Sequence, residues 1–210
     1  MLETNNMQRA YTTAYDKGWN ELANIDSNRI GKGKKIQYDK QTQTYYINFM
    51  GRDVQVSIPD RSIDQCNGPE LGIVEKVLIV HYLIKAQDRK LDKQWISFKE
   101  IPGGNVYYDA FYKRAIKPLK DCFGNNLEDF CRITQELGWR KGNIGDTSAV
   151  CSVFPTLPII YVIWQGDEEI PSTSNILFDS SAPDILSTED LAVAASLPAY
   201  QLIKILYNRQ

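Results

Sequence analysis

The only histidine of the chain, His81, lies in an apolar run that also contains Val77 and Leu78. If it faces a cavity, its imidazole can act as a base or as an axial ligand to the metal of a tetrapyrrole. The alternative is a core histidine that is hydrogen-bonded to a carbonyl or a carboxylate. Any histidine-dependent chemistry in this protein has to use His81, which is therefore the candidate metal ligand.

Three consecutive carboxylates, Asp167 to Glu169, follow an apolar run that ends at Trp164. Carboxylates in a loop at the end of a strand can bind a hard cation, hold a polar ligand or act in acid–base catalysis. Consecutive side chains point in different directions, so at most two of the three converge on one ligand. We expect Asp167 and Glu168 to contact a ligand, and the alternative is a solvated turn.

Aromatic side chains gather in the sequence around a sharp turn at residues 102–104. The cluster consists of Trp95, Phe98, Tyr107, Tyr108, Phe111 and Tyr112. Such a group can form the apolar wall of a pocket for a flat ligand, and the alternative is a packed core. The residues expected to form a ligand-binding wall are Trp95, Phe98, Tyr107, Tyr108 and Trp164.

The familiar catalytic and nucleotide-binding motifs do not occur in this sequence. There is no Walker loop, no dinucleotide-binding glycine pattern, no serine-hydrolase elbow and no zinc-protease helix motif. The glycine pair at 103–104 precedes an expected helix and is only a weak signal for a phosphate site. The four cysteines have no zinc or iron–sulfur spacing. We expect Cys122, Cys131 and Cys151 to be buried and Cys66 to be exposed.

Length and composition predict one folded domain that spans residues 1–210. The near balance of 24 basic and 26 acidic residues argues against nucleic-acid binding by bulk charge. No apolar run is long enough to span a membrane, and the N-terminus lacks the pattern of a secretory signal. We therefore expect a cytoplasmic protein that binds neither nucleic acid nor a membrane.

The charge is distributed unevenly along the chain. Between Gly142 and Ile203 there are eight Asp or Glu residues and no Lys or Arg. The rest of the chain has 24 basic and 18 acidic residues, so its balance is about +6. This asymmetry indicates either attraction between the two parts of the fold or an acidic C-terminal third that contacts a basic partner or a cation.

Hydrophobic periodicity predicts an α+β fold with an N-terminal antiparallel meander and helices packed on a mixed or antiparallel sheet. The expected strands of the meander are 36–38, 44–49 and 53–58. Two later strands, 146–154 and 159–164, are expected to join the first sheet, and residues 165–186 are expected to be irregular.

Helices are expected in five segments. These are residues 7–25, 69–86, 107–123, 127–137 and 187–195. Pro118 is expected to kink or split the third of these helices, and Ser187 is expected to be the N-cap of the last. Pro198 is expected to separate that last helix from an apolar segment at 202–207.

A set of short strings, taken in this order, resembles a prokaryotic family known as domain of unknown function 3786. The strings are His81-Tyr-Leu83, Trp95-Ile-Ser-Phe98, Pro102-Gly-Gly104 with Tyr107, Phe154-Pro with Leu157-Pro158, Trp164-x-Gly-Asp-Glu-Glu169-Ile-Pro171, Leu177-Phe-Asp179 and Leu186-Ser-Thr-Glu-Asp190-Leu. The resemblance covers residues 14–206, and the family pattern usually has Phe where this chain has Ile170.

The resemblance implies an origin in anaerobic bacteria or archaea and a link to corrinoid or one-carbon metabolism. Some relatives carry an N-terminal iron–sulfur motif, which this chain lacks, so electron transfer is not expected here. The first hypothesis is a cofactor-binding accessory protein for a corrinoid such as cobalamin. Its aromatic wall would hold the macrocycle, Asp167 and Glu168 would meet the amide fringe, and His81 would ligate cobalt.

Two other hypotheses follow from the same residues. The acidic C-terminal third can serve as a docking surface in a protein-interaction or assembly module. Asp167 or Glu168 with a divalent metal can also serve a hydrolase or lyase, although one histidine and adjoining carboxylates offer few independent ligands. A binding role is therefore preferred to an enzymatic one.

Overall fold

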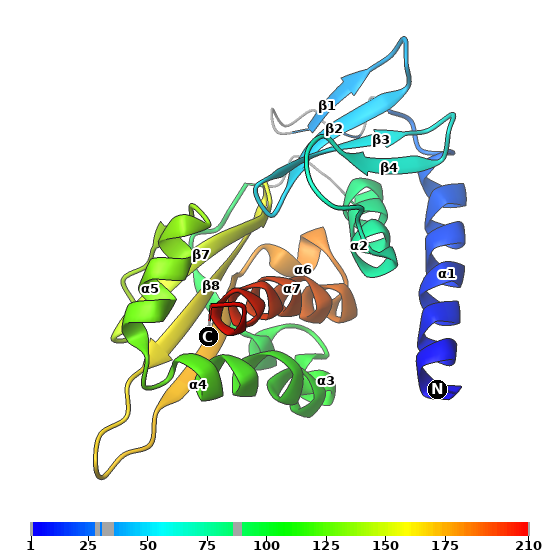
Figure 1. Cartoon of the computed structure of the whole chain (residues 1–210). Coiled ribbons are helices and arrows are strands. Elements are labelled where there is room, and N and C mark those ends of the chain that lie inside the picture. The colour runs from blue at the N-terminus through cyan, green and yellow to red at the C-terminus, as the bar shows by residue number, and fades with distance from the viewer. Residues whose placement is uncertain (1, 28–29, 31–35, 86–89, 210) are drawn as a thin grey trace. The chain divides into compact units, whose positions relative to one another are not determined.

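The computed structural model describes residues 2–27, 30, 36–85 and 90–209 (Figure 1). The chain divides into two units, which are described separately. Unit 1 comprises Met1–Lys90 with Asp184–Leu186, and unit 2 comprises Leu91–Pro183 with Ser187–Gln210. The expectation of one domain over residues 1–210 stays a prediction.

The described residues of unit 1 up to Lys85 form two helices and a four-stranded antiparallel sheet with the strand order β1-β2-β3-β4. The helices are α1 (Leu2–Leu22) and α2 (Ile73–Lys85). The strands are β1 (Ile36–Asp39), β2 (Thr44–Phe49), β3 (Arg52–Ser57) and β4 (Ser62–Gln65). The expected N-terminal meander is thus confirmed, with a fourth strand that the pattern did not predict.

Alternation of apolar and polar residues gives this sheet one buried and one open face. Tyr45 and Ile47 of β2 are buried, whereas Tyr46 between them is exposed. The β2–β3 turn has positive φ at Met50 (50°) and Gly51 (79°), as the tight hairpin turn of a twisted sheet requires. Arg52, on the buried face, pairs with Glu75 of α2 at 2.7 Å. The N-terminal part of α2 therefore lies on the buried face.

The two helices of unit 1 approach each other closely at Gly18. A β-carbon at Gly18 would lie only 2.8 Å from Cγ1 of Val80 in α2, so glycine allows this approach. α2 was expected to begin at residue 69 but begins at Ile73. Near its start, the Glu75 carboxylate accepts the N–H of Gly72 at 2.8 Å.

Unit 2 is built around a five-stranded antiparallel sheet with the order β5-β9-β8-β7-β6. The strands are β5 (Trp95–Ser97), β6 (Arg140–Lys141), β7 (Thr147–Phe154), β8 (Leu157–Trp164) and β9 (Thr173–Asp179). The helical segments are η1 (Phe98–Glu100), α3 (Gly104–Phe111), η2 (Tyr112–Ile116), α4 (Lys117–Phe123), α5 (Leu127–Glu136), α6 (Ala182–Ile185) and α7 (Thr188–Tyr207).

Two expectations about this sheet were wrong. The β7–β8 hairpin belongs to a separate sheet and does not join the meander. Residues 173–179, expected to be irregular, form β9 between β5 and β8. The polar first half of β9 pairs only with β8, and the second half pairs with β5 as well. These cross-strand partners are non-local contacts that a pattern along the chain does not show.

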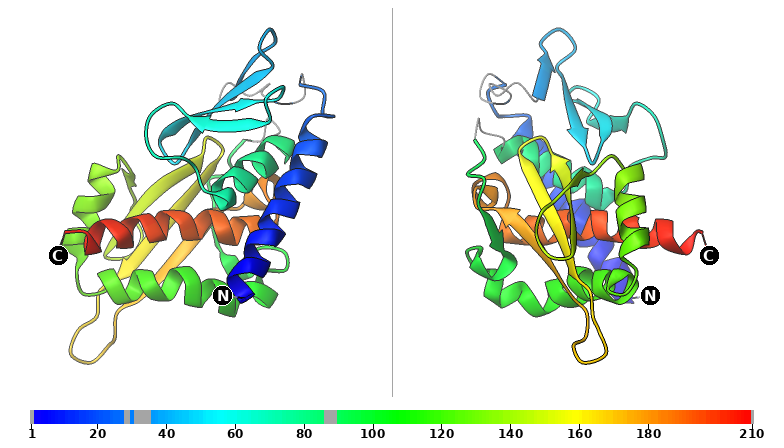
Figure 2. Two further views of the ribbon diagram at one scale, coloured as in Figure 1. Left: turned by 45° about the vertical axis from the view of Figure 1, so that its right-hand side comes forward. Right: turned by 90° about the vertical axis from the view of Figure 1, so that its left-hand side faces the viewer.

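Helices cover one face of the unit 2 sheet (Figure 2). The Tyr161 hydroxyl of β8 donates to the carbonyl of Ala195 in α7 at 2.8 Å, and Ser174 Oγ of β9 donates to the carbonyl of Ile116 at 2.9 Å. On the other face, Trp95 and Ile144 pack on a small cluster of buried strand residues. That cluster consists of Val150, Ile160 and Val162.

The two helical prolines act differently. Pro118 follows η2, a π-helical turn, so the expected interruption is confirmed. Pro198 was expected to end a helix, yet α7 continues through it to Tyr207. Its neighbours Ala194, Ala195 and Ala199 are fully buried, so packing of α7 outweighs the loss of one backbone hydrogen bond.

The cysteines follow the expectation only in part. Cys151 is buried and Cys66 is exposed, as expected. Cys131 is exposed and Cys122 is only partly buried, so their predicted burial was wrong. Phe130 and Ile133 of α5 are fully buried, whereas Cys131 lies at the edge of this packing, where its Sγ contacts Thr147 Oγ1 of β7 at 3.1 Å.

Candidate functional site

The eight residues predicted to form a site are distributed over both units. His81 lies in α2 of unit 1, and the other seven lie in unit 2.

His81 lies in the packing between the two helices of unit 1. Its side chain is partly buried, and a β-carbon built at Gly18 of α1 would lie 3.5 Å from its Cδ2 and 3.8 Å from its Nε2. This place in the helix packing is compatible with the alternative of a core histidine, and the assignment of His81 as a metal ligand stays a prediction.

The two predicted tryptophans of unit 2 share a face of the sheet but lie far apart. Trp95 pairs with Asp179 at one end of β9, and Trp164 pairs with Thr173 at the other. Six residues of extended strand separate the two pairings, which corresponds to roughly 20 Å. The structure therefore does not bring these indoles together as adjoining parts of one wall.

The remaining aromatic residues divide between core and surface. Phe98 is fully buried and stacks on Phe111 with a centroid distance of 4.2 Å. The ammonium group of Lys99 lies over the Tyr108 ring, 4.1 Å from the centroid of that ring. Tyr107 is exposed on α3. The cluster that the sequence indicated is thus partly hydrophobic core, as in the alternative interpretation.

Asp167 organises the turn between β8 and β9. Its carboxylate accepts the N–H groups of Glu169 at 2.9 Å and Ile170 at 2.7 Å, and its own N–H donates to the carbonyl of Ile170 at 2.9 Å. Hydrogen bonds from these two backbone groups lower the pKa of Asp167. Glu168 is exposed beside it. Throughout the described ranges, no group of three or more His, Cys, Asp or Glu side chains is placed to hold a metal ion.

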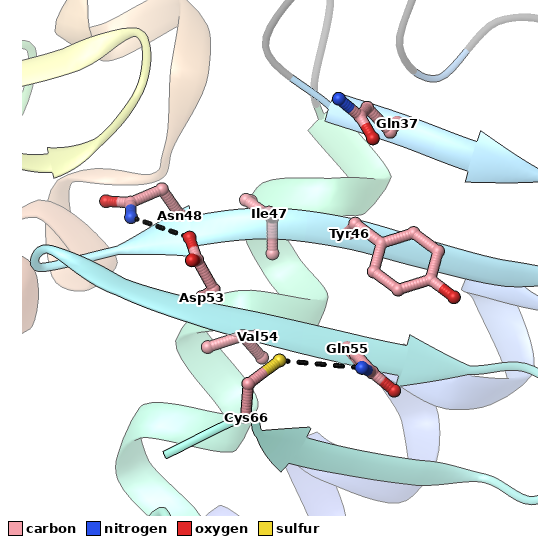
Figure 3. A pocket seen from close by; sticks show the side chains of 8 residues that line it. All are labelled: Gln37, Tyr46, Ile47, Asn48, Asp53, Val54, Gln55 and Cys66. Atoms are coloured by element: carbon pink, nitrogen blue, oxygen red, sulfur yellow. Dashed lines mark hydrogen bonds between the residues drawn. The ribbon is translucent and has the colours of Figure 1, made fainter. Parts of the chain in front are cut away.

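A hollow lies on the open face of the unit 1 sheet (Figure 3). Its volume is about 510 Å³, within the range that ligand pockets usually have. It is lined by Gln37, Tyr46, Ile47, Asn48, Asp53, Val54, Gln55 and Cys66. None of these residues was among the eight that the sequence predicted.

Strand register explains why these side chains gather. Gln37, Tyr46 and Gln55 are cross-strand partners on β1, β2 and β3, so they form one row on the open face. Asn48 and Asp53 form the next row, and the Asn48 amide donates to the Asp53 carboxylate at 3.2 Å. Figure 3 shows this row near the turn between β2 and β3, with the Tyr46 ring farther along β2.

The chemistry of the hollow is that of recognition. Three primary amides provide both donors and acceptors, Asp53 provides an acceptor, and Tyr46 provides a flat ring. The one potential nucleophile, Cys66, accepts a hydrogen bond from the Gln55 amide at 3.4 Å. The Gln55 amide cannot take up the thiol proton as a general base, and the one carboxylate of the lining, Asp53, accepts a hydrogen bond from the Asn48 amide.

Comparison with known proteins identifies the family of the chain. A family model described as domain of unknown function 3786 matches residues 26–200. The chain belongs to the DUF3786 family. No curated protein and no solved structure matches it significantly. In the part of this DUF3786 chain that the structure describes, none of the helices has the length and apolar character to cross a membrane.

The strings that carry the DUF3786 resemblance have structural roles in this chain. Tyr82 and Leu83 are buried in α2, and Ser187 is the N-cap of α7, where its hydroxyl accepts the N–H of Asp190 at 3.2 Å. Asp167 holds a turn, as described above, and Phe178 is core. In this chain these strings therefore have structural roles, and none of them contains a residue that lines the hollow of the meander.

Proposed function

We propose that this DUF3786 protein is a cofactor-binding accessory protein and that the hollow of unit 1 holds the amide-bearing rim of a corrinoid such as cobalamin. The observation that carries the proposal is the row of amide side chains beside an exposed aromatic ring. The family resemblance supplies the ligand class, and with it a cytoplasmic role in the one-carbon metabolism of an anaerobe.

The lining residues fit the rim of a corrin better than its metal. Amide side chains of the ligand both donate and accept hydrogen bonds, and Gln37, Asn48 and Gln55 match them in kind. The Tyr46 side chain, in a residue that is 37% exposed, is available to pack against the macrocycle. His81 lies in the α1–α2 packing, so this proposal assigns no cobalt ligand to it.

Substitution of Tyr46 by Ala is expected to weaken cobalamin binding about tenfold, because an aromatic contact of this kind contributes about 1.4 kcal/mol. Isothermal titration of the full chain with cyanocobalamin measures this effect. Dicyanocobinamide, which keeps the amide rim but lacks the nucleotide tail, should bind with similar affinity.

A matched control is available in Tyr207→Ala, since Tyr207 is an exposed tyrosine of unit 2. This variant should bind cobalamin as the wild type does. The proposal fails if neither corrinoid binds the wild-type protein. It also fails if Tyr46→Ala and Tyr207→Ala have the same affinity as the wild type.

A second candidate function, docking of a basic protein partner, is favoured by the turn between β8 and β9. Ile170 at this turn is 64% exposed, and Glu168 and Glu169 are exposed beside it. Asp167 holds the backbone of the turn through the three hydrogen bonds described above. An apolar tip with two acidic neighbours is complementary to a basic segment with an apolar anchor.

Reversal of both charges, Glu168→Lys with Glu169→Lys, is expected to abolish binding of a lysine- and leucine-containing peptide, and wild-type binding should weaken as salt rises. Fluorescence anisotropy with the labelled peptide measures both effects. The control is Glu189→Lys, which reverses one exposed charge at the start of α7. Equal binding by the reversed and wild-type proteins would exclude this surface.

A further inference from the structure

Arg114 differs from the other partly buried basic residues of the described chain. Four Lys or Arg residues there are partly buried, and three of them face a carboxylate. The three pairs are Arg52 with Glu75 at 2.7 Å, Lys76 with Glu70 at 2.8 Å and Lys120 with Asp121 at 3.1 Å. Arg114 has no carboxylate partner among the described residues. Partial burial of a charge costs free energy when no opposite charge lies beside it, so an anion bound at Arg114 would be stabilising.

The guanidinium of Arg114 is held by a buried serine of α7. Its Nε donates to Ser196 Oγ at 3.1 Å, and Ser196 is only 2% exposed. The Ser196 hydroxyl in turn donates to the carbonyl of Ala192 at 2.6 Å, so its proton is committed and a lone pair faces Nε. No described residue accepts a hydrogen bond from the two terminal amino groups of Arg114. One edge of the guanidinium is therefore anchored, and the donors of the other edge remain available.

Tyr200 places a phenol near this guanidinium. It lies one helical turn after Ser196 on α7, so both residues share the side of the helix that meets Arg114. Burial raises the pKa of the Tyr200 phenol, and the nearby charge of Arg114 partly offsets that rise. Figure 1 shows α7 alongside α3 and α4 within unit 2. A phenol and a guanidinium fork together can donate several hydrogen bonds to one anion.

The backbone around Arg114 is irregular as well. Arg114 lies in η2, and Pro118, four residues later, cannot donate the backbone hydrogen bond that the Arg114 carbonyl would accept in a regular helix. Single π-helical turns of this kind occur often at functional sites.

We infer that Arg114 and Tyr200 form a binding site for an oxyanion, the carboxylate or phosphate group of a small ligand. The site lies in unit 2 and is independent of the corrinoid hollow proposed for unit 1. The planar guanidinium matches the two oxygens of such a group, and Ser196 acts as the positioning residue. A bound oxyanion would neutralise the partly buried charge.

Titration of the full-length protein with inorganic phosphate and, separately, with acetate tests the site at constant ionic strength. Proton–nitrogen correlation NMR follows the Arg114 Nε–H signal directly. We expect saturable shifts of this signal in the wild type, with at least tenfold weaker binding in Arg114→Lys, which loses the planar fork. Ser196→Ala should weaken binding by a smaller factor. Lys113→Gln, a change at the neighbouring exposed cation, should bind as the wild type does.

A measurement without ligand separates this role from a structural one. If Arg114 binds an anion and does not stabilise the fold by itself, Arg114→Met should not lower the melting temperature in chloride buffer. Phosphate or acetate should then raise the melting temperature of the wild type but not of the variant. Shifts with phosphate alone would assign a phosphoryl ligand, and shifts with acetate alone a carboxylate. The inference is overturned if the wild type binds neither ion, if Arg114→Lys binds both unchanged, or if Arg114→Met melts markedly earlier.

Discussion

Replacement of Asp179 by Ala is expected to lower the free energy of unfolding by about 3 kcal/mol, because several donors lose a shared ionised acceptor. Asp179 ends β9 and is only 3% exposed. Its carboxylate accepts the N–H groups of Asp92 at 3.0 Å, Lys93 at 2.8 Å and Ser181 at 3.1 Å, and the Ser181 hydroxyl at 2.5 Å. It therefore joins the segment before β5 to the segment after β9.

The same carboxylate should make stability depend on pH. Burial raises the pKa of Asp179, but the hydrogen bonds from Ser181, Asp92 and Lys93 outweigh burial, so the pKa in the folded protein is below the ordinary value of 3.8. At pH values well above 3.8, the Asp179 carboxyl group is ionised in both the folded and the unfolded state, and its stabilisation of the fold is complete. As the pH falls below 3.8, the unfolded state takes up its proton first, and the stabilisation is progressively lost.

Urea unfolding of the wild type and of Asp179→Asn, followed by tryptophan fluorescence, tests this pH dependence. The difference in unfolding free energy should be largest near pH 7 and should shrink by about pH 3, since the variant carries no carboxyl group there to titrate. The control is Asp109→Asn, at an exposed position of α3. A difference for Asp179→Asn that stays constant over this range would mean that the carboxylate is not held in its ionised form.

The elements with strong local patterns were predictable from the sequence. In β2 the alternation of Tyr45 and Ile47 with Tyr46 indicated both the strand and its two faces, because one face packs on a core. β4 was missed because Ile63 is its only apolar residue, which is enough for an edge strand with one inward position. The polar first half of β9 likewise hid a central strand.

The candidate site was less predictable than the fold, for a physical reason. The predicted residues were chosen by chemical type along the chain, and several of them have structural roles here: Phe98 packs in the core, and Asp167 holds a turn through hydrogen bonds. The hollow of unit 1 depends on cross-strand register, which places Gln37 beside Tyr46 and Tyr46 beside Gln55. Register follows from turn geometry and burial, so single residues do not reveal it.

Replacement of Gly104 by Ala is expected to destabilise the protein by about 3 kcal/mol or more, a large effect for one methyl group. Gly104 is buried at the start of α3, and its N–H donates to the carbonyl of Ile101 at 2.8 Å. A β-carbon at this position would collide with the carbonyl oxygen of Phe98 and lie 3.0 Å from its carbonyl carbon. Because the Phe98 side chain is fully buried and stacked on Phe111, this backbone cannot move away without disturbing the core.

The adjacent glycine provides a matched control for this prediction. Gly103 has a φ of 76°, and a β-carbon there would meet nothing within 4 Å. Gly103→Ala should therefore cost only about 1 kcal/mol, the conformational penalty of the left-handed region. Thermal unfolding by circular dichroism compares the two variants directly. If both glycines served a phosphate site instead, the two substitutions would have similar small effects on stability, so equal melting temperatures would contradict the steric argument.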